Sequence, residues 1–261
     1  MRYETIEVHV DTHVARVRLA RPDLRNAFNE TMIAELTTAF EWLDAHEGTR
    51  AIVLSAEGPA FCAGADLNWM KKMAVYSDDE NRADAHRLAR MLAAIHRCGK
   101  PVIARVHGDV YAGGVGLVSV CDIAVAADTV RFCLSEARLG LIPATIAPYV
   151  IRAIGERAAC RYFMTAEVFD CVRAAQLGLV HERVAPDMLD ATVAQLAETL
   201  CANGPAAVRA CKSLVADVAG RVLDQALIDD TAERIARTRA GDEAREGVAS
   251  FLEKRMPAWR T

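Results

Sequence analysis

The sequence is poor in aromatic side chains, which make up 6% of its 261 residues, and it has no long uncharged apolar run. A membrane-spanning helix needs about 20 apolar residues in succession, so none is predicted. Charged side chains interrupt the first 19 residues, and this pattern excludes the apolar segment of a secretory signal. We therefore expect a cytoplasmic protein that does not bind membranes.

No sign of charge dominates either, because 31 basic and 35 acidic residues are interspersed and leave a net charge of −4. A chain without a strong positive field is a poor candidate for nucleic-acid binding. The eight cysteines form no C-x-x-C pair and have no histidine at ligand spacing. We expect reduced cysteines in the core and no metal site.

The pattern of apolar residues indicates an α/β fold. Residues 6–10 and 15–19 alternate between apolar and polar side chains, which predicts two strands joined by a hairpin at 11–13. The short apolar runs at 51–54, 102–106, 123–126 and 130–134 are typical of buried strands. Helical periodicity lies between them, over residues 32–43 and again from a capping-box pattern at 77–80 to residue 95.

Strand patterns nearly vanish after about residue 158. Amphipathic segments at 189–200, 206–218, 223–237 and 243–255 predict helices instead. We place a boundary near residue 195, which divides the chain into a core of residues 1–195 and a helical region of residues 196–261.

Two loops of small residues follow predicted strands, at 61–66 (FCAGAD) and 111–117 (YAGGVGL). Small side chains leave the backbone N–H groups accessible, and a helix start after the second loop would point its free N–H groups outward. Two such donors aimed at one point would form an oxyanion hole. Each loop alone fits a tight turn or close packing of a helix on a sheet equally well.

Glu136 lies in the largely apolar segment 132–143. A carboxylate in such surroundings must be paired, solvated in a cavity, or held with a raised pKa. A raised pKa suits a general acid or base near neutral pH. The alternative is an ion pair with Arg138 or another arginine.

Taken in order, residues 21–22, 26–27, 60–67, 108–123, 132–143, 178–180 and 251–255 resemble the enoyl-CoA hydratase/isomerase (crotonase) family. The resemblance implies a spiral of ββα units with a C-terminal helical region that builds a homo-oligomer, either a trimer or a dimer of trimers. It also implies an acyl-CoA substrate and no separate cofactor, since coenzyme A is part of the substrate.

The same resemblance implies roles for individual residues. The N–H groups of Ala65 and Gly113 would hold the thioester oxygen, and Glu136 would be the catalytic carboxylate. The predicted coenzyme A contacts are Arg25, Ala63, Asp66, Leu67 and Asn68, together with Phe251 and Lys254 from the tail of a neighbouring subunit.

The sequence departs from the family at one position that bears on mechanism. Hydratases of the family carry a further glutamate where this chain has Gly116. A single glutamate fits an isomerase that moves one proton along the acyl chain, yet residues 112–119 and 134–150 resemble the 3-methylglutaconyl-CoA hydratase branch. We therefore expect a hydratase of a branched enoyl-CoA, in which Asp109, Tyr149 or a substrate carboxylate orients the water, with an isomerase as the alternative.

A non-catalytic binding protein is a further alternative of a different class. It is disfavoured because no stripe of basic residues with interleaved aromatics is present. Other conspicuous residues are interpreted as structural: His107, Cys62, the pair Lys71 and Lys72, and Trp42, Trp69 and Trp259.

Overall fold

The alternating N-terminal residues form the predicted hairpin in the computed structural model, which describes residues 2–260. Strand β1 (Ile6–Asp11) pairs antiparallel with β2 (Val14–Leu19), and Thr12 turns the chain with a φ of 51°. The inward side chains Ala15, Val17 and Leu19 are fully buried. The period of two thus places one face of the hairpin against the core.

Successive turns of the chain add one strand to each of two sheets. The first sheet has the order β1-β2-β3-β5-β7-β10 and is parallel from β2 onward, with β3 (Ala51–Ala56), β5 (Val102–Val106), β7 (Ile123–Ala127) and β10 (Glu182–Val184). The second has the order β4-β6-β8-β9, with β4 (Ala60–Cys62), β6 (Asp109–Tyr111), β8 (Arg131–Cys133) and an antiparallel β9 (Val168–Asp170). The predicted spiral of ββα units is confirmed, although β4, β6, β9 and β10 were not predicted from the sequence.

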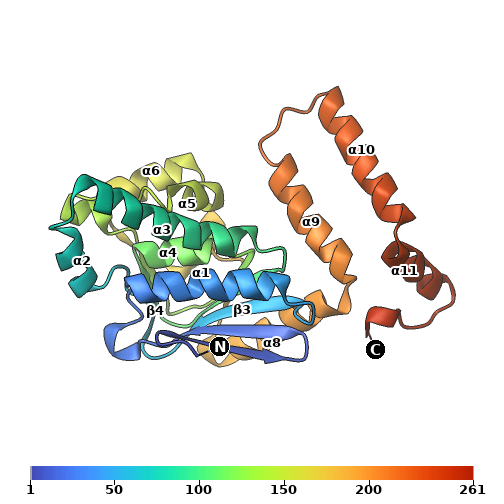
Figure 1. The fold of residues 1–261 in the computed structure, drawn as a ribbon, viewed down its shortest axis with the longest axis horizontal. Coiled ribbons are helices and arrows are strands. Elements are labelled where there is room, and N and C mark those ends of the chain that lie inside the picture. The colour runs from blue at the N-terminus through green and yellow to red at the C-terminus, as the bar shows by residue number, and fades with distance from the viewer. Residues whose placement is uncertain (1, 261) are drawn as a thin grey trace.

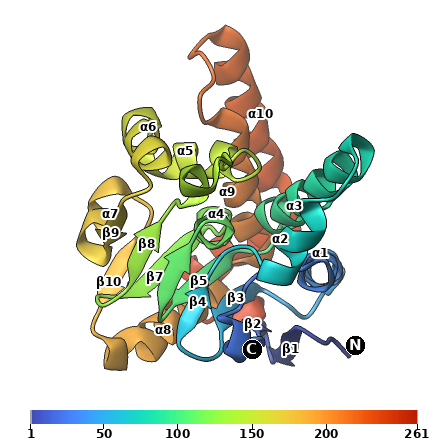
Figure 2. The ribbon, with the colours of Figure 1, turned by 90° about the vertical axis from the view of Figure 1, so that its left-hand side faces the viewer.

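Helices complete each turn and cover the sheets (Figure 2). Helix α1 (Glu30–Ala45) is capped by Asn29 and packs on α3 (Asp78–Arg97), which begins with the predicted capping box of Ser77 and Glu80. The others are α2 (Leu67–Met73), α4 (Gly113–Ser119), α5 (Ala147–Ile154), α6 (Glu156–Thr165) and α7 (Cys171–Leu177). Single 3-10 turns lie at Pro22–Leu24, Glu136–Leu139, Pro186–Met188 and Ala258–Arg260.

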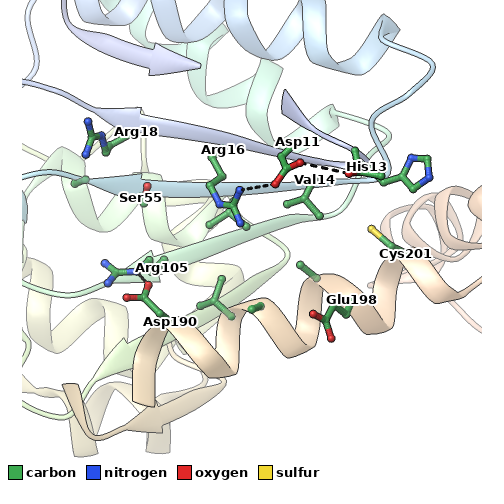
Figure 3. A pocket seen from close by; sticks show the side chains of 16 residues that line it. Asp11, His13, Val14, Arg16, Arg18, Ser55, Arg105, Asp190, Glu198 and Cys201 are labelled. Atoms are coloured by element: carbon green, nitrogen blue, oxygen red, sulfur yellow. Dashed lines mark hydrogen bonds and ion pairs between the residues drawn. The ribbon is translucent and has the colours of Figure 1, made fainter. Parts of the chain in front are cut away.

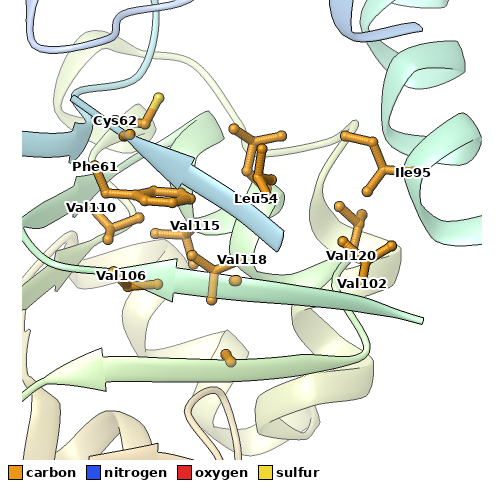
Figure 4. Close-up of a cluster of buried hydrophobic side chains, with 14 of the residues drawn as sticks. Leu54, Phe61, Cys62, Ile95, Val102, Val106, Val110, Val115, Val118 and Val120 are labelled. Atoms are coloured by element: carbon orange, nitrogen blue, oxygen red, sulfur yellow. The ribbon is translucent and has the colours of Figure 1, made fainter. Parts of the chain in front are cut away.

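Helix α4 is held inside the molecule by an apolar cluster (Figure 4). Val115 and Val118 of α4 lie beside Phe61 of β4, Val110 of β6 and Val106 of β5, and all five side chains are at most 1% exposed. The segment 111–117, predicted as a loop, therefore contains the last residue of β6 and the start of a buried helix. This packing fixes the position of the α4 N-terminus relative to the strands.

The chain leaves the core later than predicted. Residue 195 lies inside α8 (Leu189–Ala202), which packs on β3, β5 and β7. Because this helix belongs to the sheet layer along its length, we place the change to the appended helices after Ala202.

The last helices form an arm that projects from the body (Figure 1). It consists of α9 (Pro205–Val218), α10 (Gln225–Ala240) and α11 (Asp242–Leu252). Lys212 of α9 ties the arm to the body through an ion pair with Asp122 at 2.7 Å. Large apolar side chains remain exposed on the arm, among them Val215, Val248 and Phe251. Burial of these side chains against other subunits stays a prediction.

The cysteines are all free thiols, as expected, but they are not all in the core. Cys62, Cys98, Cys133 and Cys171 are buried, whereas Cys160 and Cys211 are exposed. Within residues 2–260, no helix combines the length and the apolar character needed to cross a membrane.

Candidate active site

The two small-residue loops lie against each other because their strands, β4 and β6, are parallel neighbours. A Cβ atom added to Gly64 would lie 3.0 Å from the Cβ of Ala112, and one added to Gly114 would lie 2.8 Å from the carbonyl oxygen of Cys62. Only residues without larger side chains allow this approach. The glycines thus serve the close packing that was the alternative interpretation, and the packing itself brings the two loops together.

The N–H group of Ala65 is left free by the way its loop is held. A parallel bridge joins Phe28 to Ala65, in which the Phe28 amide donates to the Gly64 carbonyl at 2.7 Å and the Asp66 amide donates to the Phe28 carbonyl at 2.8 Å. The bridge uses the groups on either side of the Ala65 amide. That amide has no acceptor among the residues that the structure describes.

The N–H group of Gly113 also has no acceptor in the part of the chain that the structure describes, because Gly113 is the first residue of α4. The preceding residue, Ala112, has φ 47° and ψ −121°, a backbone conformation that residues other than glycine rarely adopt. Its own amide donates to the Cys133 carbonyl at 2.8 Å, which anchors the strained turn to β8. Such local strain, held by surrounding structure, is common at functional sites.

Glu136 lies in the same cavity as the two amides. The cavity has a volume of about 320 Å³, and its lining includes Ala65, Gly113 and Glu136. The Oε2 atom of Glu136 is buried and has no hydrogen-bond partner in residues 2–260. Arg138, the alternative ion-pair partner, donates instead to the Ala166 carbonyl.

Burial also changes the acidity of this carboxyl group. Desolvation raises the pKa of Glu136, against a smaller lowering by a hydrogen bond from its own backbone amide. A carboxylic acid with a raised pKa can keep its proton nearer neutral pH and deliver it to a substrate.

The rest of the cavity is largely apolar. Its other lining residues are Phe28, Trp69, Met73, Asn81, Asp84, Ala85, Leu88, Ala112, Leu141, Ile142, Pro143, Ala144, Thr145 and Ile146. These described lining residues include no lysine, arginine or histidine. The cavity therefore offers an apolar surface and carboxylates, but no cation.

The position of Gly116 is filled by a neighbour. A Cβ atom at Gly116 would lie 2.2 Å from Cγ2 and 2.8 Å from Cβ of Ile146, a side chain that is 2% exposed and lines the cavity. An apolar side chain thus stands where the family's first glutamate would project. The sequence showed that this glutamate is missing, and the structure shows what takes its place.

A second carboxylate in the cavity escaped the sequence analysis. Asp84 of α3 is 4% exposed, accepts a hydrogen bond from Arg87 at 2.8 Å and from Trp69 Nε1 at 3.4 Å, and lines the cavity with Glu136. Its only signal in the sequence was a polar residue on the inner face of an amphipathic helix. Trp69, interpreted as a core aromatic, is indeed buried but also forms part of the cavity wall.

The two polar residues that were expected to orient water are not in the lining of this cavity. Asp109 forms an ion pair with Arg131 at 2.7 Å and lines a separate hollow of about 340 Å³. Tyr149 packs its ring edge-on against His96 of α3. Neither residue shares the lining of the cavity with Glu136.

The predicted coenzyme A contacts are divided between several places. Arg25 and Ala63 share the hollow of about 340 Å³ with Asp109 and Arg131. Asp66 caps α2 by accepting from the amides of Asn68 and Trp69, and it forms an ion pair with Arg21 at 2.8 Å. Its carboxylate is thus committed to structure, whereas the side chains of Leu67 and Asn68 are exposed at the start of α2.

Phe251 and Lys254 lie at the end of the arm, and α11 and α2 occupy opposite ends of the molecule (Figure 1). The Phe251 side chain is 82% exposed. Within one chain, these two residues do not approach the cavity. The prediction that they come from a neighbouring subunit is compatible with this placement and stays a prediction.

Lys72 and His107, both interpreted as structural, have structural partners. Lys72 forms an ion pair with Glu30 at 2.8 Å, and His107 shares a hydrogen bond with the Gly58 carbonyl at 2.7 Å. Burial raises the pKa of Cys62 to about 12, so its thiol is not a nucleophile near neutral pH.

A larger hollow, of about 750 Å³, lies between α8 and strands β1, β2, β3 and β5 (Figure 3). Its three arginines are already paired: Arg16 with Asp11 at 3.8 Å, Arg18 with Glu7 at 2.6 Å and Arg105 with Asp190 at 2.5 Å. None of the predicted oxyanion or catalytic residues lines it. The chemistry of the small cavity, rather than the size of this one, identifies the candidate active site.

Together, Ala65, Gly113 and Glu136 form a site for one kind of chemistry. Free amides stabilise an oxygen that gains negative charge, and a buried carboxyl group can exchange a proton with a neighbouring carbon. A carbonyl compound that passes through an enolate fits both groups.

Comparisons with known proteins are consistent with this arrangement. Residues 9–261 match the family model described as Enoyl-CoA hydratase/isomerase. The crystal structure of an enoyl-CoA hydratase from Shewanella pealeana is 41% identical in sequence, covers 99% of this chain and 97% of its own, and has a TM-score of 0.96. The enoyl-CoA hydratase ACTT6 of Alternaria alternata is 34% identical, over 94% of this chain and 80% of its own length. The mevalonyl-coenzyme A hydratase sidH of Aspergillus fumigatus is 30% identical, over 95% of this chain and 92% of its own length.

Proposed function

Because the chain belongs to the enoyl-CoA hydratase/isomerase family, we propose that it hydrates an enoyl-CoA thioester with a short, branched acyl group. The observation that carries the proposal is that Ala65 and Gly113, whose amides have no acceptor among the described residues, line one cavity with Glu136, whose buried Oε2 has no hydrogen-bond partner there.

The reaction assigns a task to each group. The thioester oxygen would accept hydrogen bonds from Ala65 and Gly113, which stabilise the enolate that forms when water adds to the β-carbon. One oxyanion donor is commonly worth a factor of about 10²–10³ in rate. Glu136 would then deliver a proton to the α-carbon, as its raised pKa favours.

The lining bears on the acyl group. The sequence resemblance favours 3-methylglutaconyl-CoA, whose acyl chain ends in a second carboxylate. The described lining offers Asp84 and Glu136 and no basic side chain to such a group. A neutral branched analogue, 3-methylcrotonyl-CoA, avoids this repulsion, so the pair of substrates tests branching and charge separately. Mevalonyl-CoA, the substrate in the name of one relative, belongs in the same panel.

Isomerisation of a 3-enoyl-CoA is a second candidate because of one observation. Ile146 occupies the space beside Gly116, so Glu136 is the one carboxylate retained of the two that the family's hydratases carry. A single carboxyl group can remove a proton from one carbon and return it two carbons along the chain.

Mass spectrometry of the products separates the two reactions. The protein is incubated with 3-methylglutaconyl-CoA, 3-methylcrotonyl-CoA, crotonyl-CoA and a 3-enoyl-CoA. We expect a gain of one water on at least one branched 2-enoyl-CoA, faster than on crotonyl-CoA. An unchanged mass with a new retention time on the 3-enoyl-CoA, without any hydration, would establish the isomerase instead.

The variant Glu136→Gln tests the site, with Glu198→Gln as its matched control. Glu198 is exposed on α8 and lines the larger hollow, outside the candidate site. Loss of the carboxyl group of Glu136 should lower turnover by about 10²–10⁴-fold, the usual contribution of one acid–base group. Equal turnover of the two variants would exclude Glu136 from the chemistry.

A further inference from the structure

Hydration needs two proton movements, and the residues assigned so far account for one. Water loses a proton when its oxygen bonds to the β-carbon, and the α-carbon gains one. Glu136 can supply the second proton. The position at which the family carries another glutamate is Gly116, whose free space is filled by Ile146.

Asp84 is the other carboxylate in the cavity. It lies on α3, whose inner face also carries Leu88, Met91 and Leu92, and its side chain is 6% exposed. Asn81 and Thr145, the remaining polar side chains of the described lining, cannot accept a proton near neutral pH.

The hydrogen bonds of Asp84 leave one of its oxygens available. Arg87 at 2.8 Å and Trp69 Nε1 at 3.4 Å both donate to Oδ1. In the part of the chain that the structure describes, Oδ2 accepts no hydrogen bond, and it is not shielded from solvent as Glu136 Oε2 is. An oxygen of this kind can hold a water molecule in the cavity.

Structural needs alone do not account for this carboxylate. Burying a charge is costly, and an ion pair with a half-exposed partner such as Arg87, 49% exposed, returns little of that cost. The contact with Trp69 is long for a hydrogen bond. An apolar residue at position 84 would suit the packing of α3 better.

We propose that Asp84 is a second catalytic carboxylate, which binds the attacking water and accepts its proton while Glu136 protonates the α-carbon. The proposal rests on the hydratase function proposed above. Arg87 is then a positioning residue that holds Oδ1 through its hydrogen bond at 2.8 Å.

The step balances as follows. Asp84 Oδ2 takes one proton from water as the water oxygen bonds to the β-carbon, and the electron pair of the C=C bond moves toward the thioester oxygen held by Ala65 and Gly113. The enolate collapses when its α-carbon takes the proton of Glu136. One molecule of water has been added, and the proton on Asp84 returns to Glu136 through solvent.

The experiment separates the two proton movements with two readouts on the full chain. The first is hydration of the best branched enoyl-CoA of the panel. The second is exchange of α-protons for deuterium in the saturated analogue 3-methylbutyryl-CoA, which needs enolate formation and one carboxyl group but no water addition. The variants are Asp84→Asn, Arg87→Gln and Glu136→Gln.

We expect Asp84→Asn to lower the kcat of hydration by at least about 100-fold, with KM within about threefold and α-proton exchange retained. Arg87 pairs with Asp84 but does not line the cavity, so Arg87→Gln should lower kcat by less than about tenfold. Glu136→Gln should lose both hydration and exchange.

Three results would overturn the assignment. If Asp84→Asn hydrates within threefold of Arg87→Gln, Asp84 acts only through its ion pair. If Asp84→Asn loses α-proton exchange as well, its role is to hold the site together. If the unaltered protein exchanges α-protons but hydrates no member of the panel, the proposed function fails, and the role of Asp84 fails with it.

Asp84→Glu keeps the test decisive should Asp84→Asn not fold. It retains the charge opposite Arg87 but moves the carboxylate by one methylene group. Loss of hydration with retained exchange supports the proposal, and unchanged hydration contradicts it.

Discussion

The contact between Gly116 and Ile146 predicts an energetic coupling between α4 and the segment before α5. Gly116→Ala adds one methyl group whose Cβ would meet Ile146 Cγ2 at 2.2 Å and Cβ at 2.8 Å. Both distances are far below ordinary contact, and Ile146 is 2% exposed. The added methyl must therefore displace a side chain inside the core.

The magnitude follows from two opposing effects. Replacing glycine by alanine inside a helix gains about 1 kcal/mol of propensity. Overpacking a filled core costs about 1–3 kcal/mol, and a contact of 2.2 Å puts this site at the upper end. We expect Gly116→Ala to lower the free energy of unfolding by about 1–2 kcal/mol, the reverse of the usual effect of this substitution in a helix.

A double-mutant cycle isolates the contact. Ile146→Ala alone should cost about 2–5 kcal/mol because it leaves a cavity. The double variant Gly116→Ala/Ile146→Ala should be more stable than the sum of the two single effects by about 1–3 kcal/mol, since the new methyl then enters vacated space. Urea unfolding of the four proteins, followed by circular dichroism, measures all four free energies.

Either of two results would refute this reasoning. If Gly116→Ala is more stable than the unaltered protein, the gain in helix propensity exceeds the cost of overpacking, and Ile146 moves aside easily. If the two effects add, Ile146 does not fill the space beside Gly116. The same geometry implies that a glutamate at position 116 can reach the cavity only when residue 146 is small.

Three further predictions concern the site and its support. Burial raises the pKa of Glu136, so ionising this group destabilises the folded chain. Thermal melts should therefore show that Glu136→Gln gains stability relative to the unaltered protein as pH rises above about 4, the pKa of an unfolded glutamate. A stability difference that does not change with pH would contradict this. Gly113→Ala places a Cβ 2.9 Å from Phe28 Cε2 and should shift the amide of residue 113. We expect kcat in the hydration assay to fall by about 10–100-fold. An unchanged kcat would show that Gly113 is not part of the oxyanion hole. Burial opposes ionisation of Asp66, yet hydrogen bonds from Arg21 and from two amides of α2 lower its pKa, so its contribution is present above the unfolded pKa and lost as pH falls through the lowered one. Arg21→Met should cost about 3–5 kcal/mol at pH 7 and less in acid, as measured by urea unfolding, and a loss equal at both pH values would show that the pair is not ionic in origin.

Local sequence was sufficient wherever a single segment decides its own structure. The alternation at residues 6–19 predicted the hairpin β1–β2, and the capping box of Ser77 and Glu80 predicted the start of α3. Both features depend on groups within a few residues of each other. Strands β9 and β10, each of three residues, were missed because so short a run carries no period, and only pairing with β8 and β7 makes them strands.

The candidate site divides in the same way. Runs of small residues predicted two loops with accessible amides, because the absence of large side chains is a local property, and the family resemblance then indicated Ala65 and Gly113 within them. That the two amides share a cavity with Glu136 follows from the parallel pairing of β4, β6 and β8, which orders three loops along one edge.

The family resemblance indicated that a glutamate is missing at Gly116. Nothing in the sequence indicated that Ile146, thirty positions along, fills its space, or that Asp84 of another helix lines the cavity. These neighbours are far apart in the sequence, and their side chains meet only because the sheets and α3 hold them there. Small-residue loops and helix caps can therefore be predicted from the sequence, because they depend on residues close together in it. The partners of a buried charge, and the side chain that fills the space at a glycine, depend on tertiary packing.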